Sequence, residues 1–311
     1  MKIWQWVVLA ILVLLAAAFF MLPTILFHSM LGRPSRTPKV PQSYMESPHY
    51  KASISGRELM KNIPSEDHYI ESRDGLKLHA YLFPAEQESK KFVLGIHGYK
   101  SYSRPEFAPY IEFYRSLGYN MLLPDDRAHA PSEGEYIGFG VLDRLDCVDW
   151  AKYIVDTYGE DVEILMHGVS MGAATVVSAS GDADLPEQVM GVVSDCGFTR
   201  AYDVMEFMLK DMMKMPGVDY LLPRVEKVCE KKAGYNFHDN AAVDLVKNSR
   251  VPMVFVHGAK DQMVPAYMVQ ELYDACPTEK RLLVVDEAAH GESIAFAPEE
   301  YHTAIRELFG I

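Results

Sequence analysis

A serine flanked by glycines lies near the middle of the chain. Residues 167–172 read HGVSMG, so Ser170 is the central residue of a G-x-S-x-G motif between an apolar run, Val162–Met166, and a small-residue stretch typical of a helix. Glycines beside the serine suit a sharp turn in which side chains would clash. The pattern is typical of a nucleophile elbow, which exposes a reactive hydroxyl at a helix start. The alternative is that Ser170 is only a small residue beginning a helix.

A serine hydroxyl needs a base to remove its proton before it becomes a good nucleophile. Among eleven histidines, His290 is the candidate, because it follows the last apolar run, Leu282–Val285, across a short loop and precedes Gly291. The alternative is an ordinary loop histidine. His257 ends an earlier apolar run, and we interpret it as a packing or hydrogen-bonding residue.

The base in turn needs an acid that holds its tautomer and stabilises the imidazolium. Asp261 is the candidate, since it follows the apolar run Met253–Val256 and precedes the histidine by one strand. Asp195 also follows an apolar run and is the alternative acid, whereas Asp286 lies too close to the strand that carries the histidine. The resulting chain order of serine, aspartate and histidine is that of α/β-hydrolases.

Negative charge on a tetrahedral intermediate is stabilised by fixed backbone donors. The N–H of Met171, which follows the serine, is one expected donor of such an oxyanion hole. The N–H of Tyr99 is the second, because Ile96-His97-Gly98-Tyr99 follows an early apolar run and Gly98 would let the backbone approach the substrate. We expect His97 to brace the loop and not to take part in catalysis.

The elements around these residues alternate between short apolar runs and longer amphipathic stretches. A hairpin is expected first, because Tyr69–Arg73 and Leu76–Phe83 flank Asp74-Gly75, a dipeptide suited to a type I′ turn. Six strand-to-helix units follow, which predicts a mostly parallel sheet covered on both faces. The expected strands are Phe92–Ile96, Asn120–Leu123, Val162–Met166, Val189–Val193, Met253–Val256 and Leu282–Val285. Helices are expected near Glu106–Leu117, Val141–Tyr158, Ala173–Ala179, Met268–Ala275 and Pro298–Phe309.

These motifs together resemble the α/β-hydrolase superfamily over residues 66–311. More narrowly, the chain is similar to bacterial membrane-anchored serine hydrolases akin to the catalytic domain of prolyl oligopeptidase and acylaminoacyl peptidase. The segment DDRAHAPSEG at 125–134 looks like the D-x-R-[GA]-H-G-x-S loop of that family, in which Arg127 and His129 would be structural. Ala130 departs from the glycine usual there. The segments at 137–143 and 194–198 also match the family.

The first 30 residues differ from the rest. From Ile3 to Leu22 every residue but Gln5 is apolar, and twenty helical residues span about 30 Å, the thickness of a bilayer core. Residues 1–30 are therefore expected to form an uncleaved transmembrane anchor, with a cleaved signal peptide as the alternative. Basic residues on both flanks leave the side of the membrane open.

Two further segments can be delimited. Residues 31–65 contain five prolines and are expected to form a linker and N-terminal extension. Within the hydrolase domain, residues 198–248 are rich in Met and aromatic side chains. In similar enzymes a helical cap lies here over the active site, and flexible thioethers would suit apolar groups. Ordinary core packing by an amphipathic helix explains the pattern equally well.

Composition and missing motifs exclude several functions. The formal charge of −13, from 30 basic and 43 acidic residues, argues against nucleic-acid binding. The sequence contains no phosphate-binding loop, no H-E-x-x-H and no dinucleotide fingerprint, so no cofactor is expected. The four cysteines form no metal-type C-x-x-C pair, so no metal is expected and they are interpreted as ordinary thiols.

The sequence therefore predicts a membrane-anchored serine hydrolase. Ser170 would attack a carboxylic ester or thioester, since alkoxide and thiolate leave more easily than an amine. His290 would act as base, Asp261 would orient it, and Tyr99 and Met171 would hold the oxyanion. A peptidase and an acyltransferase share this chemistry and remain alternatives, as does a non-catalytic scaffold domain.

Overall fold

The computed structural model describes residues 2–34 and 45–311, without the side chains of residue 9 and residues 11–19. In this part of the chain, eight strands form one sheet in the order β1-β2-β4-β3-β5-β6-β7-β8. The β1–β2 and β2–β4 pairs are antiparallel and the other pairs are parallel. The strands are β1 (Glu66–Glu71), β2 (Lys77–Phe83), β3 (Lys91–Ile96), β4 (Asn120–Asp125), β5 (Glu163–Val169), β6 (Val189–Asp195), β7 (Met253–Gly258) and β8 (Lys280–Val285).

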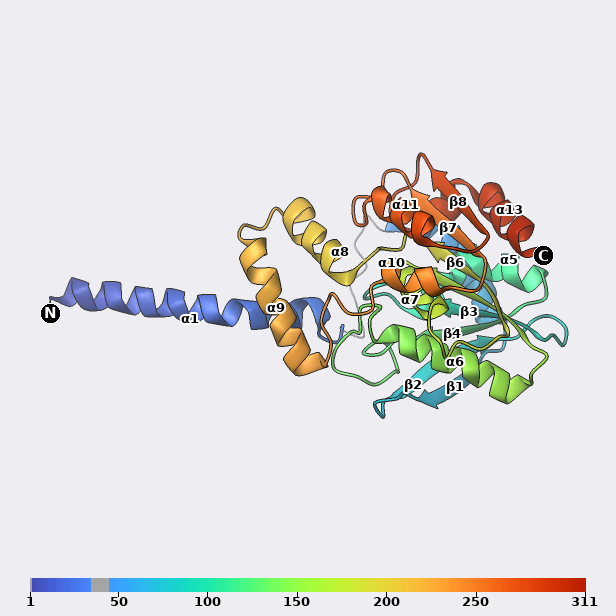
Figure 1. Cartoon of the computed structure of the whole chain (residues 1–311), viewed down its shortest axis with the longest axis horizontal. Helices are drawn as coiled ribbons and strands as arrows, with labels where there is room; N and C mark the ends of the chain where they lie inside the picture. Colours follow the sequence, from blue (N-terminus) through green and yellow to red (C-terminus); the bar gives the residue numbers. More distant parts are fainter. Residues whose placement is uncertain (1, 35–44) are drawn as a thin grey trace.

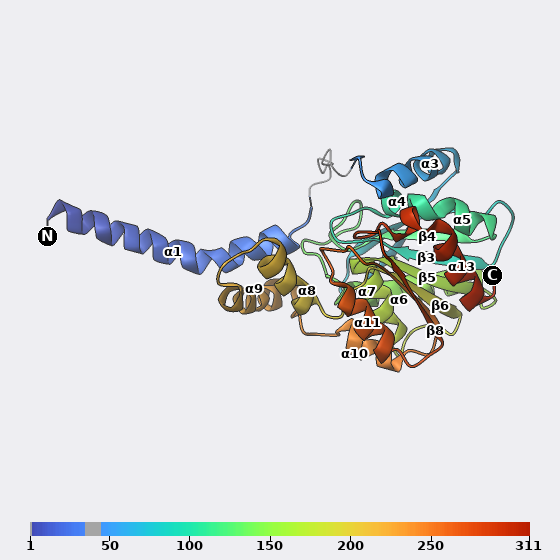
Figure 2. The ribbon, with the colours of Figure 1, turned by 90° about the horizontal axis from the view of Figure 1, so that it is seen from above.

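Helices cover both faces of this sheet (Figure 2). On one face lie α6 (Asp143–Tyr158), α7 (Met171–Ser180) and α11 (Ala266–Ala275), whose buried residues join one apolar cluster with the sheet. On the other face lie α3 (Pro48–Asn62), α4 (Ser103–Phe107), α5 (Ile111–Ser116) and α13 (Pro298–Phe309), which contribute to a second cluster. Shorter elements are η1 (Ala108–Tyr110), α10 (Ala242–Leu245), η3 (Val246–Asn248) and α12 (Ser293–Phe296).

The predicted sheet and its order of elements are confirmed, with local differences. The hairpin forms between β1 and β2, but of its two turn residues only Gly75 has a positive φ, of 85°. A type I′ turn needs positive φ at both central residues, so the predicted turn type is wrong. The helix expected near Glu106–Leu117 is divided into α4, η1 and α5, and Pro109 in η1 explains the break because proline has no N–H to donate.

The N-terminal helix α1 (Ile3–Leu31) extends away from the sheet (Figure 1). Its last turns pack on the rest of the protein, since Phe27 and Leu31 are fully buried. Among the helices in the described part of the chain, none combines the length and apolar character that crossing a bilayer requires. The predicted transmembrane anchor over residues 1–30 is therefore not supported, and part of the apolar stretch serves to pack α1 against the domain.

The segment 31–65, predicted to be a linker and N-terminal extension, contains a helix in its described part. Ten of its residues, 35–44, lie outside the described residues, but α3 occupies 48–62 and buries Ser53, Gly56 and Met60. Gly56 contacts η1 so closely that an added Cβ would lie 1.7 Å from the carbonyl oxygen of Ala108. Prolines in this segment therefore did not prevent a helix, because Pro48 occupies its first turn, where no N–H is needed.

The segment between β6 and β7 contains a helical insertion. It comprises α8 (Ala201–Phe207), η2 (Met208–Met212) and α9 (Val218–Ala233), and α9 packs beside α1 (Figures 1 and 2). Met205 is fully buried, whereas Met212 and Met213 are 42% and 62% exposed. The methionines of this insertion therefore divide between core packing and surface.

Candidate active site

Ser170 lies in a strained turn between β5 and α7. Its backbone has φ 56° and ψ −114°, a conformation that side-chain-bearing residues rarely adopt. The flanking glycines are required sterically: a Cβ on Gly168 would lie 2.1 Å from the carbonyl oxygen of Gly172, and a Cβ on Gly172 would lie 2.0 Å from that of Ile96. The N–H of Ser170 donates to the carbonyl oxygen of Asp195 on β6, at 2.8 Å, which fixes the turn against the sheet.

The structure brings Ser170, His290 and Asp261 together. The Oγ of Ser170 lies 2.8 Å from Nε2 of His290, and Nδ1 of His290 lies 2.7 Å from Oδ2 of Asp261. Since Nδ1 faces a carboxylate, it carries the proton and donates to it, which leaves Nε2 free to accept from the serine hydroxyl. The three side chains follow the carboxyl ends of β5, β7 and β8, as expected for ligand-binding residues of a parallel sheet.

His290 and Asp261 each stabilise the charged form of the other. Burial alone would lower the pKa of His290, but the hydrogen bond and negative charge of Asp261 outweigh it and raise the pKa above its usual value. Burial would raise the pKa of Asp261, yet contacts with His257 and His290 hold it well below its usual range. The backbone N–H groups of Met263 and Val264 also donate to Oδ1 of Asp261. Asp261 therefore stays ionised across the neutral range.

The alternative acid, Asp195, has other partners. Its Oδ2 accepts from the hydroxyls of Tyr110 and Tyr301, at 3.2 and 3.0 Å, beneath the turn that carries Ser170. Complete burial raises the pKa of Asp195 to about 6, even though these two hydroxyls oppose the shift. The Asp195 side chain thus accepts from two tyrosine hydroxyls, and Asp261 is the carboxylate that contacts the imidazole of His290. Asp286 is exposed.

The loop after β3 approaches Ser170 from the other side. A Cβ on Gly98 would lie 3.3 Å from Cβ of Ser170, so glycine permits the backbone of residues 98–99 to come close. Met171 is the first residue of α7, and the first N–H groups of a helix have no acceptor within it. Tyr99 directly follows Gly98, and Met171 directly follows Ser170. The two expected oxyanion donors therefore come directly after two residues that are in contact.

The end of α1 holds the Tyr99 loop in place. The Tyr99 hydroxyl donates to the carbonyl oxygen of Met30, and Nζ of Lys100 donates to that of Ser29 at 2.7 Å. Helix C-termini attract positive charge and hydrogen-bond donors, because their last carbonyls lack partners within the helix. These contacts were not predicted, since the residues of α1 were expected only to form a membrane anchor.

The loop residues predicted to be structural are buried and hydrogen-bonded. His97 contacts the carbonyl oxygen of Gly98 at 2.8 Å and accepts from the N–H of Asp126 at 3.0 Å. His129 accepts from the N–H of Lys100, and Arg127 pairs with Asp74 and Asp146. These contacts tie the loop after β4 to the Tyr99 loop.

Ala130, which departs from the sequence pattern that the segment 125–134 resembles, takes a left-handed backbone. Ala130 has φ 40°, in the region that glycine occupies without steric cost. Its carbonyl oxygen accepts from the guanidinium of Arg33 at 2.6 Å. The loop therefore keeps the glycine-type conformation with an alanine in place.

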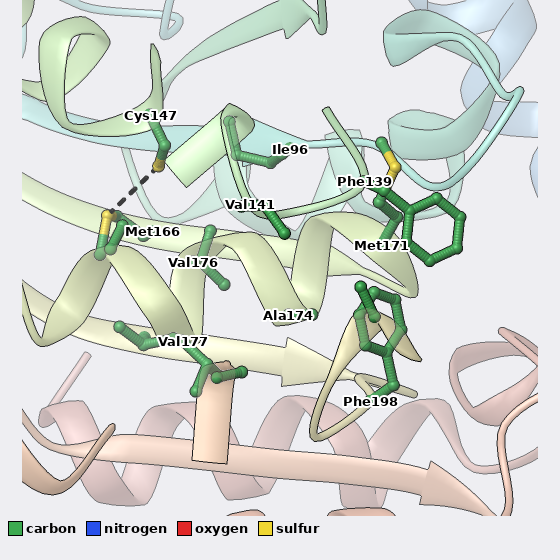
Figure 3. Packing of buried hydrophobic residues seen from close by; sticks show 14 of the residues in the cluster. Ile96, Phe139, Val141, Cys147, Met166, Met171, Ala174, Val176, Val177 and Phe198 are labelled. Atoms are coloured by element: carbon green, nitrogen blue, oxygen red, sulfur yellow. Dashed lines mark hydrogen bonds between the residues drawn. The ribbon is translucent and has the colours of Figure 1, made fainter. Parts of the chain in front are cut away.

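Apolar side chains line the start of α7. Phe139, Met171 and Phe198 lie together at that end of the helix, close to Ala174 (Figure 3). The rings of Phe139 and Phe198 stack with centroids 5.4 Å apart, and Tyr99 meets Phe139 at 5.2 Å. These three aromatic rings form a continuous row beside the residues that flank Ser170.

Ligand atoms of Cys196, Asp261 and His290 lie within 4.8 Å of one another, which is close enough for a metal site. However, Nδ1 of His290 and Oδ2 of Asp261 are hydrogen-bonded to each other, and Nε2 faces Ser170. Burial also raises the pKa of the Cys196 thiol well above its usual value, which disfavours the thiolate that binds metals. These residues fit a hydrogen-bonded triad better than a metal centre. All four cysteines are buried and unpaired in disulfides.

Comparison with known proteins gives the fold a name. An esterase from Pyrococcus furiosus superposes with a TM-score of 0.66 at 24% identity, over 90% of this chain and 97% of that one. The chain has the α/β-hydrolase fold. The α/β-hydrolase GrgF from Penicillium (TM-score 0.61, 14% identity, 80% of this chain and 100% of that one) and the acylaminoacyl peptidase of Pyrococcus horikoshii (0.58, 17%, 81% and 43%) share it.

The sequence relatives that match this chain are uncharacterized proteins. No family model matches the chain. An uncharacterized Bacillus subtilis protein, YqkD, is 23% identical over 199 residues, which cover 64% of this chain and only 65% of YqkD. An uncharacterized membrane protein of Saccharomyces cerevisiae, YNL320W, is 24% identical over 75% of this chain and 76% of its own length.

Proposed function

We propose that this α/β-hydrolase is a serine hydrolase that cleaves carboxylic esters or thioesters. His290 removes the proton of Ser170 as its Oγ attacks the carbonyl carbon, and Asp261 stabilises the imidazolium that forms. The N–H groups of Tyr99 and Met171 hold the oxyanion of the tetrahedral intermediate. His290 then protonates the leaving alcohol or thiol, and water attacks the acyl-enzyme by the same route in reverse.

The single observation that carries this proposal is the hydrogen-bonded series from Ser170 Oγ through His290 to Asp261, at 2.8 and 2.7 Å. A structural serine at a helix start would need neither a strained backbone nor an imidazole supported by a buried carboxylate. Gly168 packs against Gly172, and Gly172 packs against Ile96, so both glycines are required by the sharp turn. A turn of this kind presents the serine hydroxyl, which supports a catalytic role for that hydroxyl.

An apolar acyl group suits the surroundings of Ser170. The row formed by Tyr99, Phe139 and Phe198 offers an apolar wall. The Lys100 ammonium lies over the Tyr99 ring, 4.9 Å from its centroid, but it donates to the carbonyl oxygen of Ser29. We propose that residues 198–248 act as a cap beside this wall, since Phe198 begins the segment and Met212 and Met213 expose flexible thioethers. A peptidase activity is the second candidate, because an acylaminoacyl peptidase shares the fold.

A panel of nitrophenyl esters of increasing acyl length, run beside aminoacyl nitroanilides, tests the proposal. We expect ester hydrolysis by the wild-type protein and its loss in Ser170→Ala, while Ser55→Ala, at an exposed position on α3, keeps full activity. Preferred turnover of nitroanilides would support the peptidase. Equal turnover by wild type and Ser170→Ala would contradict both.

A further inference from the structure

A second imidazole lies beside the Asp261 carboxylate. Nε2 of His257, at the end of β7, is 3.3 Å from Oδ2 of Asp261, the same oxygen that accepts from His290. The side chains of His257 and Asp261 are both fully buried. We propose that His257 is a positioning residue, which holds Asp261 and its loop in the orientation that His290 requires. The inference rests on the proposed function of the triad.

The contacts of His257 fix where its proton lies. Nε2 is 2.9 Å from the carbonyl oxygen of Val264 and close to a carboxylate oxygen, so both neighbours of this nitrogen are acceptors. Nε2 must therefore carry the hydrogen. This N–H donates to the carbonyl oxygen of Val264 and also interacts electrostatically with the Asp261 carboxylate. Nδ1 is buried, and no described residue hydrogen-bonds to it.

This geometry closes a ring of contacts around the acid. His257 holds Val264 through its carbonyl oxygen, and the N–H of Val264 donates to Oδ1 of Asp261 at 2.9 Å. One oxygen of Asp261 is thus held by backbone donors, and the other lies between two imidazoles. Loss of the His257 donor would loosen the loop and leave more negative charge on the oxygen that faces His290.

Other charged groups near His290 also affect its pKa. Asp195 at the end of β6 and Glu106 on α4 both raise the pKa of His290, in addition to Asp261, and the neutral Cys196 thiol lies 3.9 Å from Nε2. A change at position 257 also acts on Asp195, whose pKa His257 lowers. Asp261 contacts both imidazoles directly, so we expect it to carry the larger part of any shift in the titration of His290.

The test compares His257→Leu with His257→Gln by the pH profile of ester hydrolysis. The amide nitrogen of glutamine can replace Nε2 as a donor, whereas leucine cannot. We expect His257→Leu to lower kcat about tenfold with little change in KM, and to move the acidic limb of kcat/KM up by roughly 0.5 pH unit, as expected for loss of one hydrogen-bond donor. His257→Gln should restore kcat to within about threefold of wild type and keep the wild-type limb.

Thermal unfolding and near-ultraviolet circular dichroism separate folding from positioning. Equal losses in both variants with an unmoved acidic limb would overturn the positioning role, as would wild-type kcat in His257→Leu. If His257→Leu does not fold, the comparison of His257→Gln with His257→Asn, whose shorter amide does not reach, decides by the same criteria. Wild-type protein without ester turnover would instead contradict the proposed function itself.

Discussion

The Oγ of Ser170 and Nε2 of His290 lie 2.8 Å apart, although 120 positions separate them in the chain. Strands β5 and β8 are separated in the sheet by β6 and β7, so the loop after β8 must fold back across two strands to make this contact. Gly291, with φ 68°, makes that fold possible directly after the imidazole.

Asp261→Asn should impair catalysis far more than binding. An amide can offer its N–H to Nδ1 of His290 and so favour the wrong tautomer, and the equivalent change in other serine hydrolases costs about 10⁴-fold in kcat. We expect a loss of about 10³- to 10⁴-fold with a nearly unchanged KM. Asp286→Asn, at an exposed position in the loop before His290, is the matched control. A loss below about tenfold would rule out Asp261 as the acid.

The pH profile should report the charges around His290. The base must be neutral to accept a proton, and its pKa is raised, so kcat/KM should fall as the pH drops through a value above 6.5. Asp195→Asn removes a negative charge that contributes to this shift and should move the acidic limb to lower pH. Glu187→Gln, an exposed change, should leave it in place. An upward shift in Asp195→Asn would contradict this electrostatic account.

Gly172→Ala should destabilise the protein, because the new methyl group would lie 2.0 Å from the carbonyl oxygen of Ile96. Backbone atoms on β3 cannot move aside cheaply, so we expect a loss of about 3 kcal/mol in the free energy of unfolding. Gly118→Ala has a positive φ but no atom within 4 Å and should cost only about 1 kcal/mol. Chemical denaturation measures both. Equal costs would show that steric contact at the elbow is unimportant.

Ala130→Gly should stabilise the protein. The native residue has φ 40°, where glycine avoids a steric cost of about 1 kcal/mol. We expect the midpoint of thermal unfolding to rise by about 2 °C. Ala52→Gly, inside helix α3, should have the opposite effect, because glycine lowers helix stability by about 0.5–1 kcal/mol. A fall in the midpoint for Ala130→Gly would show that the loop does not strain its alanine.

The sequence predicted the sheet well because each strand is a local pattern, and the candidate triad was chosen from residues that directly follow such strands. Each strand is an apolar run, and the candidate residues follow the runs directly, so the topology of a parallel sheet brings them to one edge. The choice between Asp195 and Asp261 as the acid could be argued from strand order. Only the structure shows that the hydroxyls of Tyr110 and Tyr301 donate to the Asp195 carboxylate.

Relationships across the fold were beyond the sequence. Nothing in the residue pattern shows that carbonyl groups at the end of α1 accept from Tyr99 and Lys100, or that His257 lies beside Asp261. The same limit applies at the N-terminus. Apolar composition alone does not reveal that Phe27 and Leu31 are buried against the protein.

The most direct test of a reactive serine is covalent labelling with a fluorophosphonate, followed by mass spectrometry of the modified peptide. We predict stoichiometric labelling of the wild-type protein with the adduct on Ser170, and no adduct in Ser170→Ala. An unlabelled wild-type protein, or an adduct that persists at this site in Ser170→Ala, would contradict the account.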